Sequence, residues 1–198
     1  MWLESIAAIN RYLADDFDRG ISRRAERELW YGHADMNTGK RTATSYGALD
    51  AFFPAVLAMS GDIQRAKRLQ DSGYKMWMLQ DIEPEELNYR SMTITYPGYP
   101  LRPEIVESAY YLYHYTRNEK YRRMGEAMFR DFVKHCRTDE GYATLKSVVT
   151  KEKTDQMHSF LFAETFKYFY LLFAPPRTLR FSQVIFNTEA HPIRRTWH

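Results

Sequence analysis

The chain of 198 residues has little of several things that would define its class. It has one cysteine, Cys136, so no disulfide can form within it and cysteine usage says nothing about the redox compartment. Its longest apolar run, Phe166 to Ala174, is interrupted by Lys167 and is far shorter than the roughly 20 residues that cross a bilayer. The start, Met1 to Arg11, has no apolar stretch of signal-peptide length. We predict neither a membrane helix nor a secretion signal.

An excess of one charge is also missing. The 28 basic and 25 acidic side chains give a net charge of +3, and the basic ones are scattered. This distribution argues against a nucleic-acid-binding surface. The hydrophobic content of 44% is enough for a core, and no linker or low-complexity tract interrupts the chain. We therefore expect residues 1–198 to form a single unit.

Apolar residues recur at spacings of three and four, which predicts successive amphipathic helices. Gly61 can end one helix and Asp62 can cap the next, while Pro103 suits a first helical turn. We expect six helices, near Leu3–Phe17, Ser45–Met59, Asp62–Leu79, Pro103–Thr116, Glu119–Cys136 and Gln156–Phe173.

Turn-rich and alternating segments separate these helices. Gly32–Thr42 is predicted to be a loop or short hairpin, and Ile94–Tyr99 an aromatic loop. Short strands are expected at Gly141–Leu145, Val148–Thr150 and Gln183–Thr188. The predicted fold class is all-α with short β hairpins.

Glu104 and Glu107 fall in the first turn of a predicted helix, on one face. Acidic residues there commonly compensate the helix dipole, which is one interpretation. Arg102 just upstream favours another, because a guanidinium beside two carboxylates can hold one of them ionised and orient it.

Glu164 lies in an apolar segment, four residues after Phe160 and three before Lys167. One interpretation is a surface ion pair of Glu164 with Lys167. The other is a carboxylate in an apolar cleft, where Phe160 would stack on a sugar ring. Thr188 and Glu189 further on offer the oxygen atoms that calcium prefers, although a strand threonine is usually only that.

These stretches, in this order and at these separations, resemble the C-terminal half of glycoside hydrolase family 47, the class I α-1,2-mannosidases. The resemblance runs from about Trp30 to Pro192, and Ala51–Pro54, Gly61–Ile63 and Ala48 are most like its ER degradation-enhancing (EDEM) branch. Its anchors are Tyr99–Ser108, Gly141–Ala143, Glu164–Tyr168 and Thr188–Pro192.

The resemblance implies a partial (α/α)7 barrel and an inverting, calcium-dependent enzyme that removes terminal α-1,2-linked mannose from high-mannose N-glycans. Glu104 would be the general base and Thr188 the direct ligand of calcium. Substrate-binding roles would fall to Arg102, Glu107, Phe160, Glu164 and Glu189.

Two departures from the family pattern matter. The family's proton-donating glutamate lies in its N-terminal half, so we expect this chain to be the C-terminal portion of a catalytic domain and to be inactive alone. His158 stands where the family usually has glutamate, which is expected to alter the water shell around calcium.

By the same resemblance, the chain would act in the endoplasmic reticulum lumen on misfolded glycoproteins, with a protein disulfide isomerase as a further partner. A second hypothesis is a non-catalytic module that binds mannose glycans in glycoprotein quality control. A helical scaffold unrelated to sugars is the third, and it leaves Glu164 unexplained.

Overall fold

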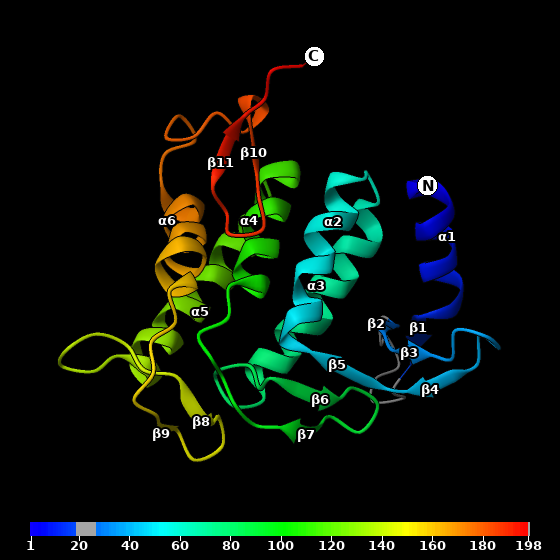
Figure 1. The fold of residues 1–198 in the computed structure, drawn as a ribbon, viewed down its shortest axis with the longest axis horizontal. Coiled ribbons are helices and arrows are strands. Elements are labelled where there is room, and N and C mark those ends of the chain that lie inside the picture. The colour runs from blue at the N-terminus through cyan, green and yellow to red at the C-terminus, as the bar shows by residue number, and fades with distance from the viewer. Residues whose placement is uncertain (19–26, 198) are drawn as a thin grey trace.

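The computed structural model describes residues 1–18 and 27–197. Six α-helices are present in that part of the chain, as expected from the periodicity. They are α1 (Trp2–Tyr12), α2 (Phe53–Met59), α3 (Ile63–Met78), α4 (Glu104–Thr116), α5 (Glu119–Cys136) and α6 (Phe166–Phe173). Figure 1 shows α4 in the middle of the molecule, and it packs against α2, α3, α5 and α6. In this part of the chain no helix is long and apolar enough to cross a membrane.

Local signals define the ends of these helices. Gly61 has a φ of +91° after α2, and the Asp62 carboxylate accepts a hydrogen bond from the Arg65 amide (3.2 Å) as the N-cap of α3. The Asn118 side chain caps α5 in the same way. These stop and start residues, which the sequence predicts, allow consecutive helices to fold back on one another.

Helix α4 is buried along most of its length, which fixes the position of its first turn. Ile105, Val106, Ala109 and Leu112 are each at most 1% exposed. Buried Ser108 donates a hydrogen bond to the Ala51 carbonyl (2.6 Å) and accepts one from the Ala55 amide (3.2 Å), which ties α4 to the segment of α2. The glutamates of the first turn are therefore held by a rigid element.

The strands form short antiparallel sheets between the helices. Most lie at the lower end of the molecule in Figure 1, whereas the last hairpin lies at the upper end beside α4 and α6. The two-stranded sheets pair β1 (Ala14–Phe17) with β2 (Glu28–Tyr31), β3 (His33–Ala34) with β4 (Arg41–Ala43), β8 (Leu145–Ser147) with β9 (Glu152–Lys153) and β10 (Val184–Phe186) with β11 (Pro192–Arg194). A three-stranded sheet has the order β5 (Ser45–Gly47), β6 (Glu86–Asn88), β7 (Thr93–Tyr96).

Several predicted bounds are wrong. The first helix ends at Tyr12, and Ala14–Phe17 is a strand, because pairing with β2 overrides the local periodicity. Ser45–Gly47 is likewise a strand, followed by a 3₁₀ turn at Ala48–Phe52. The strand β7, Thr93–Tyr96, takes up the first half of the expected aromatic loop at Ile94–Tyr99.

The other misplaced bounds lie towards the C-terminus. The strands expected at 141–145 and 148–150 lie later, at Leu145–Ser147 and Glu152–Lys153. The sixth helix was expected from Gln156, but helical structure begins at Leu161 with a π-helical turn, Leu161–Thr165, that leads into α6. The hairpin predicted within Gly32–Thr42 is confirmed as β3 and β4.

Candidate active site

Arg102 organises the carboxylates at the first turn of α4. Its guanidinium makes a bidentate pair with Glu85, in which Nε lies 3.1 Å from Oε2 and Nη2 contacts Oε1. Its third nitrogen, Nη1, lies 3.9 Å from Glu104 Oε1. The side chains of Arg102 and Glu85 are 20% and 19% exposed, so little solvent screens the pair. This geometry fixes the guanidinium beside Glu104.

The backbone just before α4 is strained. Leu101 is fully buried and has a φ of +68°, in the left-handed region that a leucine rarely adopts. Its carbonyl accepts a hydrogen bond from the Thr165 hydroxyl (2.8 Å), a buried contact that links this turn to the segment before α6. Unusual backbone at such a junction is typical of functional sites.

Burial raises the pKa of Glu104 to about 7, opposed by the positive charge of Arg102 and reinforced by the negative charges of Glu107 and Glu164. Glu104 Oε2 is enclosed and has no hydrogen-bond partner in the described part of the chain. A carboxyl group with a pKa near neutrality can accept a proton from water at physiological pH.

Glu164 lies in the π-helical turn. It is half-buried. Burial, followed by the negative charges of Glu189 and Glu107, raises its pKa to about 7. Within the described ranges Glu164 forms no ion pair with Lys167, whose Nζ instead donates to the Ala190 carbonyl (2.7 Å). The structure therefore disfavours the surface ion pair.

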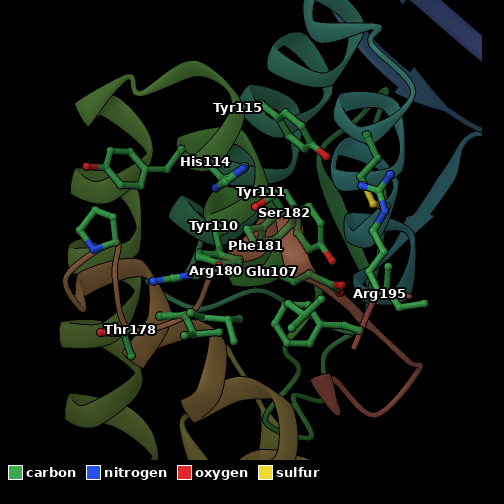
Figure 2. A pocket seen from close by; sticks show the side chains of 18 of the residues that line it. Glu107, Tyr110, Tyr111, His114, Tyr115, Thr178, Arg180, Phe181, Ser182 and Arg195 are labelled. Carbon is green, nitrogen blue, oxygen red and sulfur yellow. The ribbon is translucent and has the colours of Figure 1, made fainter. Parts of the chain in front are cut away.

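Glu107 faces a cavity of about 1070 Å³ that α2, α4 and the C-terminal segment enclose. Its carboxylate accepts a hydrogen bond from the Tyr168 hydroxyl (2.8 Å), which opposes the rise in its pKa that burial causes. Thr188 also lines this cavity. Figure 2 shows Glu107 on the same cavity wall as aromatic side chains such as Tyr111 and Phe181.

Phe160 lies beside Arg102, immediately before the π-helical turn. The guanidinium carbon of Arg102 lies 6.0 Å from its ring centroid. The imidazole of His158 is stacked on the same ring, with centroids 5.0 Å apart and an interplanar angle of 14°. The departure from the family at His158 therefore acts on the predicted sugar-stacking ring.

Thr188 and Glu189 lie in the turn of the β10–β11 hairpin. The Asn187 side chain shapes this turn, since its Oδ1 accepts hydrogen bonds from the amides of Glu189 (3.1 Å) and His191 (2.9 Å). Thr188 is exposed and has its hydroxyl and carbonyl oxygens available at the cavity.

The described residues contain no cluster of three or more His, Cys, Asp or Glu side chains that could hold a metal. A site built on one threonine would not contain such a cluster. The donors near the hairpin turn, a hydroxyl, a carbonyl and the neighbouring carboxylates of Glu164 and Glu189, are the hard oxygens that suit calcium. The chemistry of these oxygen atoms therefore fits a hard cation such as calcium.

A family model, glycosyl hydrolase family 47, matches residues 1–195. The chain belongs to this family. Alpha-mannosidase I MNS5 of Arabidopsis thaliana is 36% identical over 173 residues, which are 85% of this chain and 30% of that protein. The human ER degradation-enhancing alpha-mannosidase-like protein 2 is 32% identical over 90% of this chain and 34% of its own length. This family 47 chain thus spans about a third or less of these relatives.

The family 47 fold is also seen in a solved structure. An alpha-1,2-mannosidase from Trichoderma reesei superimposes with a TM-score of 0.77 at 24% identity, over 98% of this chain and 46% of that one. The likeness shows that the helices and short strands described above are arranged as in that protein.

Sequence reasoning missed two residues of this candidate site. Glu85 holds Arg102 in place, and Tyr168 donates a hydrogen bond to Glu107. Tyr168 falls within the stretch Glu164–Tyr168 that carries the resemblance, and that position was the available signal. Glu85 lies 17 residues from Arg102, where no local spacing reports the contact.

Proposed function

We propose that this chain supplies the general-base and metal-binding side of an α-1,2-mannosidase site, which removes terminal mannose from high-mannose N-glycans with inversion. The observation that carries the proposal is Glu104, a nearly enclosed carboxyl whose pKa of about 7 and position beside Arg102 suit a base for water. Names of relatives, such as the ER degradation-enhancing proteins, favour misfolded glycoproteins of the endoplasmic reticulum lumen as the clients.

In this proposal each site residue has its own role. Glu104 takes a proton from the attacking water, and Arg102 keeps Glu104 oriented. Phe160 stacks on the sugar ring. The hydroxyl and carbonyl of Thr188 hold calcium, which when bound supplies positive charge to orient sugar hydroxyls. Further polar contacts to the sugar and to calcium-bound water come from Glu107, Glu164 and Glu189.

The helical hairpins would form part of an (α/α)7 barrel, with residues 1–198 acting as one unit. An inverting site needs a second carboxyl about 6.5–9.5 Å from the base, across the scissile bond. The family resemblance places that acid outside these residues. We therefore expect residues 1–198 alone not to release mannose. A protein disulfide isomerase partner stays a prediction from the resemblance.

The test measures binding and hydrolysis separately. Calorimetric titration of the chain with α-1,2-mannobiose in the presence of calcium should show binding that EGTA abolishes, and Thr188→Ala should weaken or abolish that binding. Thr42→Ala, at an exposed strand threonine, is the matched control and should bind as the wild type does. Calcium-independent binding, or none, would contradict the proposed site.

Hydrolysis distinguishes the enzyme from the binding module. In a longer form of the protein that includes the acid, Glu104→Gln should lower the rate of mannose release by about 100-fold or more, because it removes the base. Binding without any release by that longer form would instead support the non-catalytic glycan-binding module. Release by residues 1–198 alone would contradict the expectation of inactivity.

A further inference from the structure

Glu83 is a fully enclosed carboxyl group that the proposed mechanism does not use. It lies in the segment between α3 and β6, is 0% exposed, and is flanked by buried Ile82 and Pro84. In the described part of the chain neither of its oxygens has a hydrogen-bond partner. An ionised carboxylate in such a place costs several kcal/mol unless a charge compensates it.

The positive charge near Glu83 is too small to compensate a negative charge on its carboxyl group. The acidic neighbours are Glu104 and Glu85, and the cation is Arg102. That guanidinium is already engaged in two contacts with Glu85 and lies 3.9 Å from Glu104. Three carboxyl groups therefore share one cation, and they cannot all be ionised in a buried site.

Two tyrosines in the described part of the chain also lie near Glu83, and both are neutral at physiological pH. They are Tyr46 of β5 and Tyr99, both at most 1% exposed. The Tyr46 hydroxyl has no hydrogen-bond partner among the described residues, whereas Tyr99 donates to the Arg102 carbonyl (3.4 Å). These groups bring no positive charge, so a proton on Glu83 itself is the remaining way to neutralise it.

The environment also decides which carboxyl carries the proton. The side chain of Glu104 is 13% exposed and lies near Arg102, whereas Glu83 is sealed. We propose that Glu83 and Glu104 form a carboxyl pair that holds one proton, with the proton on Glu83 and the negative charge on Glu104. Glu83 is then a positioning residue for the general base, an inference that rests on the proposed function of Glu104.

The pair has a consequence for Glu104. An ionised Glu83 would add a second negative charge beside it and would hold Glu104 protonated to higher pH. A protonated Glu83 leaves Glu104 free to ionise near neutrality. Burial and the charge of Glu104 both raise the pKa of Glu83 well above its ordinary value, which agrees with this order of ionisation.

The test follows the glutamate carboxyl carbons by NMR in chains labelled with carbon-13, from acidic to mildly alkaline pH. One carboxyl should stay protonated after Glu104 has ionised, and its signal should be missing from Glu83→Gln. Glu104→Gln removes the neighbouring charge and should lower the midpoint of Glu83 by about 1 pH unit or more. Glu140→Gln, at an exposed turn residue, should change neither midpoint.

Several results would contradict the proposed carboxyl pair of Glu83 and Glu104. Glu83 would not be the proton-bearing member if it titrated together with the exposed glutamates, or if the persistently protonated signal disappeared in Glu104→Gln instead. An unchanged Glu83 midpoint in Glu104→Gln would show that the two carboxyls do not interact. If Glu83→Gln does not fold, the wild type and Glu104→Gln still decide the question.

The same titration separates this inference from the proposed function. Glu83→Gln keeps a neutral side chain, so the midpoint of Glu104 should stay at its wild-type value. If Glu83 had a purely structural role, replacing it would change only the stability of the fold. The pH midpoint of the Glu83 titration would then be the same in Glu104→Gln as in the wild type. Mannose release that survives Glu104→Gln would refute the role of Glu104 as base without altering the NMR result.

Discussion

Glu104→Gln should make the protein more stable at alkaline pH. Burial raises the pKa of Glu104 from 4.5 to about 7 in the folded state. The folded state therefore binds this proton more tightly than the unfolded state does, and the resulting stabilisation is complete below about pH 4.5. It is lost as the pH rises through 7. Glutamine is uncharged at every pH and does not show this loss.

The magnitude follows from the size of the pKa change. A rise of the Glu104 pKa from 4.5 to about 7 changes the free energy of unfolding by at most about 3 kcal/mol between acidic and alkaline pH. The side chain is only 13% exposed, so solvent screening reduces the figure little. Relative to the wild type, the variant should gain up to that amount above pH 7 and almost nothing below pH 4.5.

Urea denaturation followed by tryptophan fluorescence, at a series of pH values, measures the effect. The quantity of interest is the free energy of unfolding of Glu104→Gln minus that of the wild type. A difference that is the same at both ends of the pH range, or that favours the wild type at alkaline pH, would refute the reasoning. Glu140→Gln, which removes an exposed charge, should give a difference that is small at every pH.

Three further substitutions test the packing around the site. Thr165→Val removes the buried hydrogen bond to the Leu101 carbonyl and should lower the free energy of unfolding by about 1–2 kcal/mol, whereas serine should retain most of it. Tyr168→Phe removes the hydrogen bond that lowers the pKa of Glu107, so a carbon-13 NMR titration should find that pKa higher, and a lower value would contradict the contact. Gly125→Ala would place a Cβ against the side chain of Leu172 in α6, closer than van der Waals contact allows, and should lower the free energy of unfolding by about 1–3 kcal/mol. An unchanged urea midpoint would show that α5 and α6 pack less closely.

Helices with strong caps could be predicted from the sequence. Glu119–Cys136 has the predicted bounds, because Asn118 and the apolar spacing that follows it are local signals. Ala14–Phe17 was misassigned because its partner strand starts at Glu28, and no local pattern reports such pairing. Short strands depend on partners distant in the sequence and are poorly predicted for that reason.

The candidate site shows the same limit. Glu104 and Glu107 could be placed together because a helix fixes their spacing. The buried state of Glu83 could not be predicted, since Pro84-Glu85-Glu86 after it reads as an exposed acidic turn. Its neighbours include Tyr46 of β5 and Glu104 of α4, which are distant in the sequence and come together only in the tertiary structure.

The π-helical turn at Leu161–Thr165 has a consequence for which sequence changes this region can accept. Such a turn contains one residue more than an α-helical turn would, and it sets the rotational phase between Phe160 and α6. Because the wider turn takes up that extra residue, deleting one residue within it would restore a regular α-helix and leave the rotational phase between Phe160 and α6 nearly unchanged. A one-residue deletion within Leu161–Thr165 should therefore be tolerated more readily than a one-residue deletion within α6, which would rotate the chain before it by about 100°. The free energies of unfolding of the two deletion variants, measured by urea denaturation, should differ in that direction.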